Sequence, residues 1–419
     1  MKFQSPRGTE DVLPSDSYRW VHLETTFRRI ASQFGYLEVR TPTFEDTNVF
    51  LRTAGDTSEV VTKQMYTFID KGDRSITLKP EGTAGVVRAL IQGNLIQQGK
   101  VLRASYITPI FRYERPQKGR LREAHQFGLE CIGTQNVRAD AEIIIATHAF
   151  YEAIGIKSTV VKVNSLGQEE CQSRYRQVLL DFAMPLLSEG TPEALEAARK
   201  NPLRLLDSKD PAMIEALAKA PSILDYLEPE SKGRFDELQR LLTGAGVPFE
   251  IDPKIVRGLD YYSETVFEVQ STLLGSQSAL CGGGRYDGLA KELGGPVTPS
   301  VGVGMGVERA LIVLEELGVE LPRLAEPVYV GAMVDGGIDA AEEVARTLRR
   351  TGRSALLDFE PRKAPKLIAR AEEAGAQWLV LIGEDELASG SAAVRNLQSR
   401  EQVVVRREEV AQWFAHSSR

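Results

Sequence analysis

Two stretches of the chain combine a guanidinium group with tyrosine hydroxyls. The first, Ile255–Tyr262, reads IVRGLDYY, and the second, Cys281–Gly288, reads CGGGRYDG. Arginine makes charge-assisted hydrogen bonds to phosphate, and a tyrosine hydroxyl can both donate to and accept from a polar ligand. Together the two stretches predict that the protein binds a small polar ligand beside a phosphate.

A carboxylate and a hydroxyl lie at a third position, Lys79–Thr83 (KPEGT), where an expected strand ends and an expected helix begins. Glu81 and Thr83 are well placed there to bind an ammonium group. The same two side chains would also satisfy the free N–H groups at the start of the helix. The local sequence leaves both interpretations open.

A basic loop, residues 115–122, joins two segments whose alternation predicts a β-hairpin. The hairpin would have a polar face with Arg112, Gln126 and Glu130, and an apolar face with Phe111, Phe127 and Leu129. Residues 100–122 contain seven Lys or Arg and one acidic residue, on a chain with a formal net charge of −7. The loop is therefore either a solvated turn or a contact for a nucleic-acid backbone. Likewise, Arg112 either binds a phosphate or forms a surface ion pair.

Glycines recur on two expected strands without forming a nucleotide-binding motif. Gly282–Gly284 matches neither the dinucleotide pattern nor the P-loop, so we interpret it as backbone that passes close to a ligand or a strand. Close strand packing also explains Gly302, Gly304 and Gly306. Arg309 follows at the start of an expected helix, where the helix dipole and the guanidinium together attract anions.

Several elements must position these residues. An amphipathic helix is expected over 17–35, because apolar residues recur there every three or four positions. Residues 168–245 indicate a helical insertion, in which a capping residue before proline marks helix starts at 191–192, 201–202 and 210–211. After Leu321 the order is strand 328–334, helix 340–350, strand 355–359, helix 363–374, strand 378–382, two further strands and a final helix. This alternation predicts a separate α/β domain with a mostly parallel sheet.

Length and composition are those of a multidomain globular protein. The 419 residues, 42% of them hydrophobic, are enough for two or three domains. The three cysteines are widely separated, which favours buried thiols over a disulfide framework or a metal site. No apolar run approaches the roughly 20 residues of a membrane span, and the first residues contain no signal-peptide core. We therefore expect a cytoplasmic protein without membrane contact.

Taken in their order along the chain, these segments resemble the three motifs of class II aminoacyl-tRNA synthetases, and specifically those of the histidyl-tRNA synthetase family. The matching segments are Arg7–Pro14 (N-terminal signature), Pro42 (motif 1, at the dimer interface), Phe111–Glu130 (motif 2), Gly304–Arg309 (motif 3), and Arg257–Tyr262 with Gly283–Gly288 (the two histidine-specific motifs). The resemblance implies an α+β catalytic core with a mixed, mostly antiparallel sheet flanked by helices. It also implies a helical insertion and a C-terminal α/β domain with a mostly parallel mixed sheet.

The resemblance also implies domain boundaries and site residues. The catalytic domain would span 1–167 and 246–321, the helical insertion 168–245, and the anticodon-binding domain 326–419. The residues implied for histidine are Glu81 and Thr83 (ammonium), Gln126 (near the carboxylate), Glu130, Tyr262 and Tyr286 (around the imidazole), together with Tyr261 and Arg257. Those implied for ATP are Arg112, Glu114 and Arg309, with Arg257 and Arg112 as the catalytic pair, and those for the acceptor end of tRNA are Gln117, Arg120 and Arg122.

The implied function is that of a ligase that activates L-histidine with ATP to histidyl-adenylate. It would then transfer the histidyl group to the 3′ end of tRNA(His), releasing AMP and pyrophosphate. Mg2+ is the expected cofactor, held mainly through the ATP phosphates. The expected partners are tRNA(His), through the motif 2 loop and the C-terminal domain, and a second copy of the chain. The alternative is a non-catalytic, histidine-binding regulatory subunit of histidine biosynthesis, but such relatives lack the RGLDYY segment and the C-terminal domain.

Overall fold

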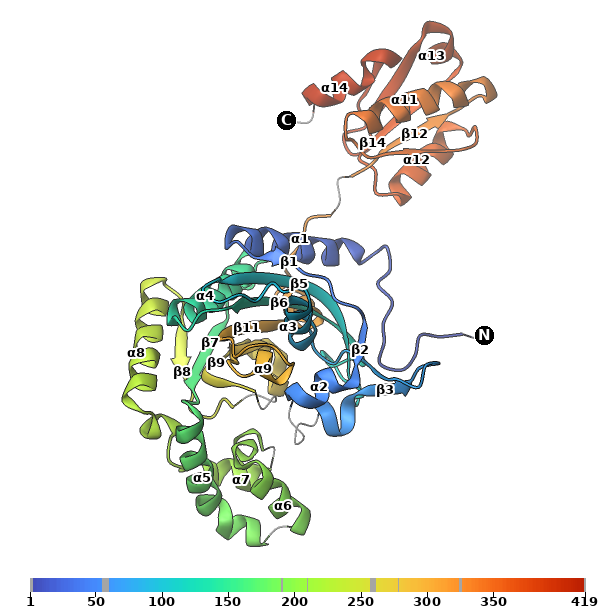
Figure 1. Ribbon diagram of the computed structural model, residues 1–419. Helices are drawn as coiled ribbons and strands as arrows, with labels where there is room; N and C mark the ends of the chain where they lie inside the picture. Colours follow the sequence, from blue (N-terminus) through green and yellow to red (C-terminus); the bar gives the residue numbers. More distant parts are fainter. Residues whose placement is uncertain are drawn as a thin grey trace. The chain divides into compact units, whose positions relative to one another are not determined.

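The computed structural model describes residues 3–54, 60–189, 191–208, 210–256, 261–277, 279–323 and 326–417. The chain divides into two compact units, Met1–Leu321 and Pro322–Arg419. Each unit has its own hydrophobic core, so each is described by itself (Figure 1).

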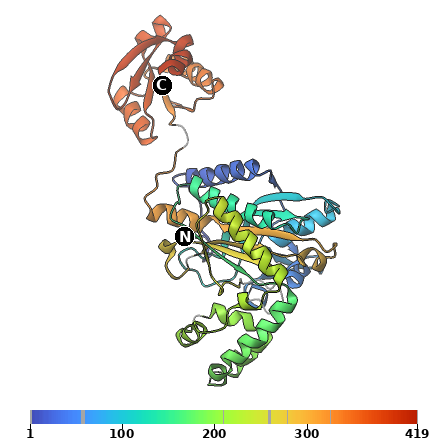
Figure 2. The ribbon, with the colours of Figure 1, turned by 90° about the vertical axis from the view of Figure 1, so that its left-hand side faces the viewer.

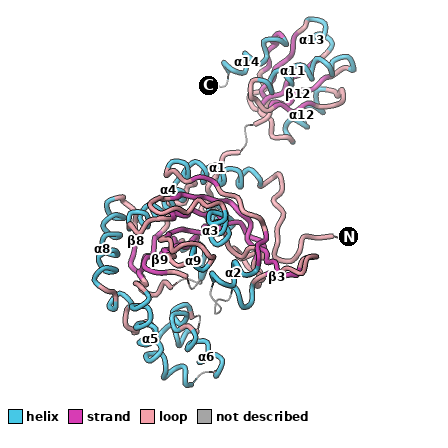
Figure 3. Tube along the Cα trace, viewed as in Figure 1, coloured by secondary structure: helices cyan, strands magenta, loops and turns pink. Residues whose placement is uncertain are grey.

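A curved sheet of eight strands organises the described part of the first unit (Figures 1 and 3). In spatial order the strands are β1 (Leu37–Glu38), β5 (Leu102–Phe111), β6 (Glu123–Ile132), β11 (Ser300–Gly306), β10 (Ala279–Arg285), β9 (Ser263–Gln270), β7 (Val160–Ser165) and β8 (Phe249–Ile251). The outermost pairings, β1 with β5 and β7 with β8, are parallel, and the pairings between them are antiparallel. The expected mixed, mostly antiparallel sheet is confirmed.

Helices cover both faces of this sheet. One face packs against α1 (Ser17–Gln33), α4 (Val137–Ala153), α8 (Pro229–Gly244) and α10 (Val307–Glu316), and the other against α3 (Thr83–Gln92) and α9 (Leu289–Glu292). In α1, Leu23, Phe27 and Ile30 recur at three- and four-residue intervals and are buried against the sheet. The amphipathic helix expected there is confirmed, and it ends two residues earlier than the sequence indicated.

The predicted hairpin is also confirmed, as β5 and β6. Within it, Phe127 and Leu129 point into the main core and are buried, whereas Gln126 and Glu130 point to the opposite face. Residues 112–122 join the two strands and are called the β5–β6 loop below. The hairpin thus brings a polar strand face and a basic loop together at one place.

A small sheet and its flanking helices deliver the segment that contains Glu81. The sheet consists of β2 (Phe44–Asp46), β4 (Ser75–Leu78) and β3 (Tyr66–Ile69), with α2 (Thr47–Ala54) and the π-helical turn η1 (Val60–Gln64) between β2 and β3. Because β4 ends three residues before Glu81, it leads the chain directly to the N-terminus of α3.

Residues 168–245 are mostly helical in their described part. They contain α5 (Glu169–Glu189), α6 (Pro192–Lys200), the 3-10 helix η2 (Pro202–Asp207), α7 (Pro211–Leu217), the 3-10 helix η3 (Ile223–Tyr226) and α8. Helices begin at Pro192, Pro202 and Pro211 as expected, the second of them a 3-10 helix. The expected cap is present at Asp210, whose side chain accepts the Ala212 N–H at 3.0 Å, whereas the Asn201 side chain makes no capping hydrogen bond to η2. In Figures 1 and 2, α5 to α7 extend from the sheet around a core of their own, whereas α8 packs against α4 and the main core.

The second unit has a five-stranded mixed sheet in its described residues. The spatial order is β13 (Ala355–Leu357), β12 (Val328–Ala332), β14 (Trp378–Ile382), β15 (Ser391–Asn396) and β16 (Gln402–Arg406). The first three strands are parallel, and β15 and β16 are added in antiparallel orientation. The helices are α11 (Ile338–Arg350), α12 (Ala364–Glu373), α13 (Glu384–Ser389) and α14 (Val410–Ser417), with 3-10 turns η5 (Asp335–Gly337) and η6 (Arg407–Glu409). The alternating order is confirmed, although α13 was not expected.

Two predictions from composition can be compared with the structure. Cys131, Cys171 and Cys281 are all buried, as expected for structural thiols. Among the described helices, none is both long enough and apolar enough to cross a membrane.

Candidate active site

A buried carboxylate lies at the centre of the candidate site. Glu130, on β6, is 0% exposed and accepts hydrogen bonds from the Thr83 hydroxyl at 2.7 Å and from the Tyr286 hydroxyl. Burial raises the pKa of Glu130 to about 8, because the charged carboxylate loses its hydration. The group is therefore mostly protonated at neutral pH, and a cationic or hydrogen-donating ligand would stabilise its ionised form.

Tyr106, on β5, completes this arrangement and was missed by the sequence analysis. Its hydroxyl lies 3.4 Å from the Thr83 hydroxyl, and its pKa lies well above the ordinary value because the ring is desolvated and Glu130 is near. We call Thr83, Tyr106, Glu130 and Tyr286 the Glu130 cluster. Strand alternation could have placed Tyr106 on the polar face, because it is six residues, an even number, before Arg112.

Glycines on neighbouring strands make room for this cluster. A Cβ atom on Gly302 would lie 1.7 Å from the Glu130 carboxylate, and one on Gly304 would lie 1.9 Å from the Gln126 amide. Side chains on Gly82 and Gly128 would overlap the ring of Tyr106, at 2.3 Å and 2.0 Å. The β11 glycines thus admit polar side chains from β6, which is more than the close strand packing that the sequence indicated.

Glu81 and Gln126 hold the start of α3 against the sheet. The Glu81 carboxylate accepts the backbone N–H groups of Thr83 and Ala84 at 2.7 and 2.9 Å, and its pKa is raised by burial. The Gln126 side-chain oxygen accepts the Gly82 N–H at 2.9 Å. Of the two interpretations left open for Glu81, the structure shows the helix-capping contact. Thr83 instead directs its hydroxyl to Glu130.

Tyr261 and Tyr262 adjoin the cluster. Their ring centroids are 4.7 Å apart, and that of Tyr261 is 5.7 Å from that of Tyr286. The pKa of Tyr261 lies well above its ordinary value, mainly because of desolvation. Arg257 belongs to the same sequence motif but lies outside the described residues.

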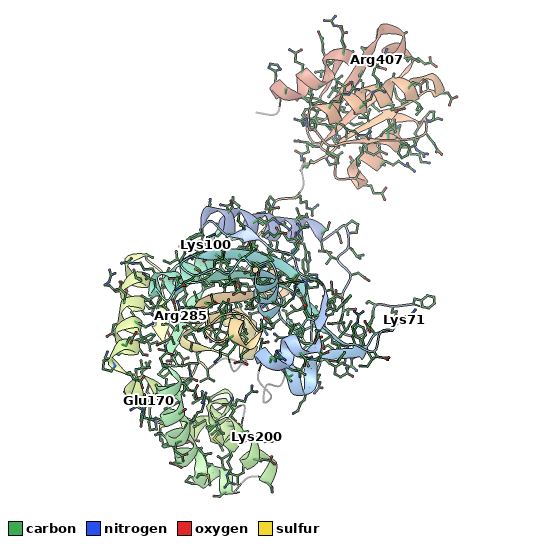
Figure 4. The ribbon with its side chains drawn as sticks, in the orientation of Figure 1. Lys71, Lys100, Glu170, Lys200, Arg285 and Arg407 are labelled. Atoms are coloured by element: carbon green, nitrogen blue, oxygen red, sulfur yellow. The ribbon has the colours of Figure 1, made fainter. Side chains whose placement is uncertain are left out.

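A buried ion pair holds the backbone on both sides of Tyr286. Arg285, labelled in Figure 4, is fully buried and binds both oxygens of Asp140 on α4, together with the Thr134 carbonyl at 2.9 Å. Its third partner is Asp287 at 3.2 Å, which also accepts the Ser300 N–H at 3.0 Å. Because Arg285 and Asp287 flank Tyr286, these contacts fix the direction of its side chain.

Three arginines form a cationic region beside the cluster. Arg112 donates from Nε to the Pro80 carbonyl at 2.7 Å, and Arg309 donates from Nε to the Gly119 carbonyl at 3.2 Å. Desolvation lowers the pKa of both, and the neighbouring charge of Arg120 adds to this effect. Glu114 offsets part of the charge through an ion pair with Arg120 at 3.2 Å. This cationic region is suited to a polyphosphate, whose negative charge would relieve the repulsion between the guanidinium groups.

The tip of the β5–β6 loop is a tight turn with exposed charge. Gln117 and Arg120 exchange two backbone hydrogen bonds, at 3.1 and 2.8 Å, and Gly119 between them has a φ of +74°. Lys118 forms an ion pair with Glu316 at the end of α10. The turn therefore places Gln117 beside Arg120 of the cationic region.

The start of α10 is fixed by a second contact that sequence analysis missed. The Glu308 carboxylate accepts the backbone N–H of His125 at 2.9 Å and lies 2.9 Å from its ring Nδ1. Since His125 precedes Gln126 and Glu308 precedes Arg309, this contact ties the position of Gln126 on β6 to that of Arg309 on α10. The contact becomes known only when α10 is packed against β6, because His125 and Glu308 are 183 positions apart in the sequence.

The described residues contain no group of three or more His, Cys, Asp or Glu side chains that would hold a metal ion. Magnesium commonly binds through one or two carboxylates together with substrate phosphates, which needs no such group. Glu114, paired with Arg120 beside Arg112, is a carboxylate of the required kind.

Comparison with known proteins adds the family. A family model described as "Histidyl-tRNA synthetase" matches residues 8–310, and one described as "Anticodon binding domain" matches residues 328–416. A "Histidine--tRNA ligase" from Streptococcus pyogenes serotype M3 is 43% identical over 421 residues, covering 100% of this chain and 99% of the relative. A protein of the same name from Streptococcus pneumoniae is 44% identical over 418 residues, covering 99% and 97%.

Solved structures agree with these matches. The apo histidyl-tRNA synthetase of S. aureus has a TM-score of 0.83 and 33% identity, covering 99% of this chain and 100% of that one. A Bacillus halodurans C protein described as an ATP phosphoribosyltransferase regulatory subunit/histidyl-tRNA synthetase has a TM-score of 0.65 over 91% and 99% of the two chains. At 21% identity, this likeness shows the fold alone. Since the family model covers most of the chain and the ligases align over its full length, this chain belongs to the histidyl-tRNA synthetase family.

Proposed function

We propose that this chain is a class II histidine–tRNA ligase. It activates L-histidine with ATP to histidyl-adenylate and transfers the histidyl group to the 3′ end of tRNA(His), releasing AMP and pyrophosphate. The observation that carries this proposal is the full-length similarity to named ligases, with both a synthetase and an anticodon-binding model matched.

Recognition of the imidazole is assigned to Glu130, Tyr286, Tyr261 and Tyr262. A ring N–H of histidine donates to the Glu130 carboxylate, and tyrosine hydroxyls serve the remaining polar positions. The raised pKa of Glu130 supports this assignment. Burial disfavours the ionised carboxylate, and a ligand that donates a hydrogen bond to it would stabilise that ionised form. Buried polar groups left without a partner are costly, so amino acids that lack an imidazole are rejected.

The backbone end of histidine is assigned to Glu81, Thr83 and Gln126. Glu81 and Thr83 bind the ammonium group, and Gln126 binds near the carboxylate. Glu81 and Gln126 already accept backbone N–H groups of the α3 start, which fixes their side chains before the substrate arrives. An ammonium group would also lower the pKa of Glu81 from its raised value.

The cationic region is assigned to ATP. Arg112, Glu114 and Arg309 bind the nucleotide, and Arg112 acts with Arg257 on the α-phosphate during attack by the histidine carboxylate. Fixed cations oppose the repulsion between the two approaching anions, and removal of one such donor commonly costs about 10² to 10³ in rate. Arg112 has a fixed position because Pro80 holds its Nε. Glu114 is the carboxylate that would help to hold an Mg2+ bound mainly through the ATP phosphates, and such an ion would neutralise part of their charge.

Transfer RNA is assigned to two surfaces. Gln117, Arg120 and Arg122 of the β5–β6 loop contact the acceptor end, where the local positive charge suits a phosphate backbone. The second unit binds the anticodon, in keeping with its match to an anticodon-binding model. Removing residues 322–419 should abolish charging of tRNA(His), while histidine-dependent exchange persists. Unimpaired charging by the truncated chain would exclude the second assignment.

The same proposal includes an assembly, a location and domain limits. Two copies form a homodimer through the motif 1 region, where Leu37, Phe44 and Ile69 expose 51–75% of their surface. The reaction takes place in the cytoplasm, with its tRNA substrate. The catalytic domain spans 1–167 and 246–321, with 168–245 inserted and 326–419 following. Light scattering of the purified chain checks the dimer.

The decisive experiment is ATP–pyrophosphate exchange with each of the twenty amino acids, using the full-length chain and Mg2+. Exchange with histidine alone is expected, followed by charging of tRNA(His) in the presence of tRNA. The alternative, a histidine-binding regulatory subunit, predicts histidine binding by calorimetry without exchange. That result would overturn the proposed activity while leaving the family membership intact.

A further inference from the structure

The N-terminal signature has no part in the chemistry proposed above, yet it forms a defined turn. Residues Pro6–Thr9 close on themselves, since the Thr9 N–H and hydroxyl both donate to the Pro6 carbonyl, at 3.0 and 2.8 Å. Gly8, the third residue of the turn, has a φ of +87°. This conformation favours glycine strongly, as in a type II turn.

The turn lies directly against both arms of the β5–β6 loop. The Gly8 carbonyl accepts the N–H groups of Arg122 and Glu123 at 2.7 and 3.4 Å, where the loop re-enters β6. A Cβ atom on Gly8 would lie 2.9 Å from Arg122 Cγ and 3.0 Å from Pro116 Cγ. Two separate reasons therefore require glycine at position 8: the positive φ of its backbone, and the lack of space for a side chain beside the loop.

Arg122, which Gly8 contacts, in turn contacts three other residues of the loop. Its carbonyl accepts the Arg112 N–H at 2.9 Å, and its Nε donates to the Glu114 carbonyl at 3.2 Å. Its guanidinium carbon lies 4.0 Å from the centre of the Tyr113 ring. The direction of the Arg122 side chain thus depends on a backbone that Gly8 holds from outside.

We propose that the Pro6–Thr9 turn is a strap that holds the β5–β6 loop ready for the acceptor end of tRNA, with Gly8 as the positioning residue for Arg122. This inference rests on the proposed function, which assigns Arg122 to that end of tRNA. A loop that is ordered beforehand loses less freedom on binding, so the strap strengthens tRNA binding. Arg112 has a separate anchor on the Pro80 carbonyl, so adenylate formation depends much less on the strap.

The test compares Gly8→Ala with Gly99→Ala in the full-length chain. Gly99 also has a positive φ, +76°, but a Cβ added there meets nothing within 4 Å. It therefore reproduces the backbone strain without the contact to the loop. For Gly8→Ala we expect the KM for tRNA(His) to rise roughly threefold to tenfold, with histidine-dependent exchange within about twofold of the original. Gly99→Ala should leave both unchanged.

Two outcomes would overturn the strap. One is an equal KM for tRNA in the two variants, and the other is a parallel loss of exchange and charging in Gly8→Ala together with a lowered Tm, which indicates general destabilisation. As a second variant, Thr9→Val removes the hydroxyl bond that closes the turn and should give a smaller rise in the same KM. Failure of the unaltered chain to catalyse exchange would instead contradict the proposed function.

Discussion

The Glu130 cluster and the β5–β6 loop differ in how their charged groups are held. Glu130 is fully buried, and hydroxyl groups from α3 and from the residue after β10 bind its carboxyl oxygens. In the loop, Lys118 and Glu316 pair while their side chains remain 68% and 45% exposed. A buried polar group left without its partner is costly, whereas an exposed ion pair contributes little.

This difference separates two kinds of recognition. The hydroxyl groups of the cluster are held in place by Glu130, which suits the selection of one small side chain under the assignment proposed above. The loop is held by surface pairs and by backbone contacts with other segments, which suits a large, charged partner that must bind and leave. Substitutions in the cluster should therefore act strongly and on histidine alone, and substitutions in the loop weakly.

The largest effect is expected for Glu130→Gln, which keeps the shape but removes the carboxylate. The kcat/KM for histidine should fall roughly 10- to 100-fold, the range for losing a hydrogen bond to a charged group. The KM for ATP should stay within about twofold, because the cationic region is untouched. Exchange kinetics with each substrate varied in turn measure both quantities. Equal losses for histidine and ATP would remove the distinction between the two regions.

A smaller effect is expected for Gly302→Ala. The added methyl group would lie 1.7 Å from the Glu130 carboxylate and 2.8 Å from the Leu129 carbonyl, so Glu130 must turn away. The KM for histidine should rise about tenfold. Gly288→Ala is the matched control, because a Cβ at Gly288 meets nothing within 4 Å. If the two variants bind histidine equally well, the glycines of β11 do not shape the cluster.

The pH dependence of stability tests how firmly Glu130 is buried, and it can be measured in the absence of bound histidine. The pKa of Glu130 is about 8 in the folded chain and 4.5 for the ordinary, solvated carboxyl, so between these values the folded chain holds a proton that the unfolded chain has lost. The stability from this proton is complete below pH 4.5 and is lost as pH rises to about 8. The free energy of unfolding, relative to that of Glu130→Gln, should therefore fall between pH 5 and pH 8 in denaturant titrations. A difference that does not change with pH would contradict the raised pKa.

The smallest effect is expected for Glu316→Gln in the loop region. Lys118 and Glu316 are both exposed to solvent, and salt screens such pairs. Thermal unfolding should give the same Tm for the variant and the original chain at 0.15 M salt. A marked drop in Tm would mean that the loop is held as firmly as the cluster.

Sequence patterns predicted those features that depend on local order. Alternation placed Gln126 and Glu130 on one face, and proline after a capping residue marked the start of α7. The missed features depend on contacts between distant segments. Tyr106 joins the cluster only because Gly82 and Gly128 leave room for its ring, and Thr83 binds Glu130 across 47 positions of sequence. Spacing can place Tyr106 on the polar face of its strand, but the side chains that it meets there become known only when the strands are paired and α3 is packed against them.

The glycines around Tyr106 also limit how the specificity of this enzyme could be changed. At Gly82, Gly128 and Gly302, substitution can only add atoms, so each change would make the proposed histidine site smaller. A larger or differently shaped amino acid would have to gain its volume from the aromatic side chains instead. Tyr106 is the first position to shorten in such a redesign, because its ring lies against two of these glycines, Gly82 and Gly128.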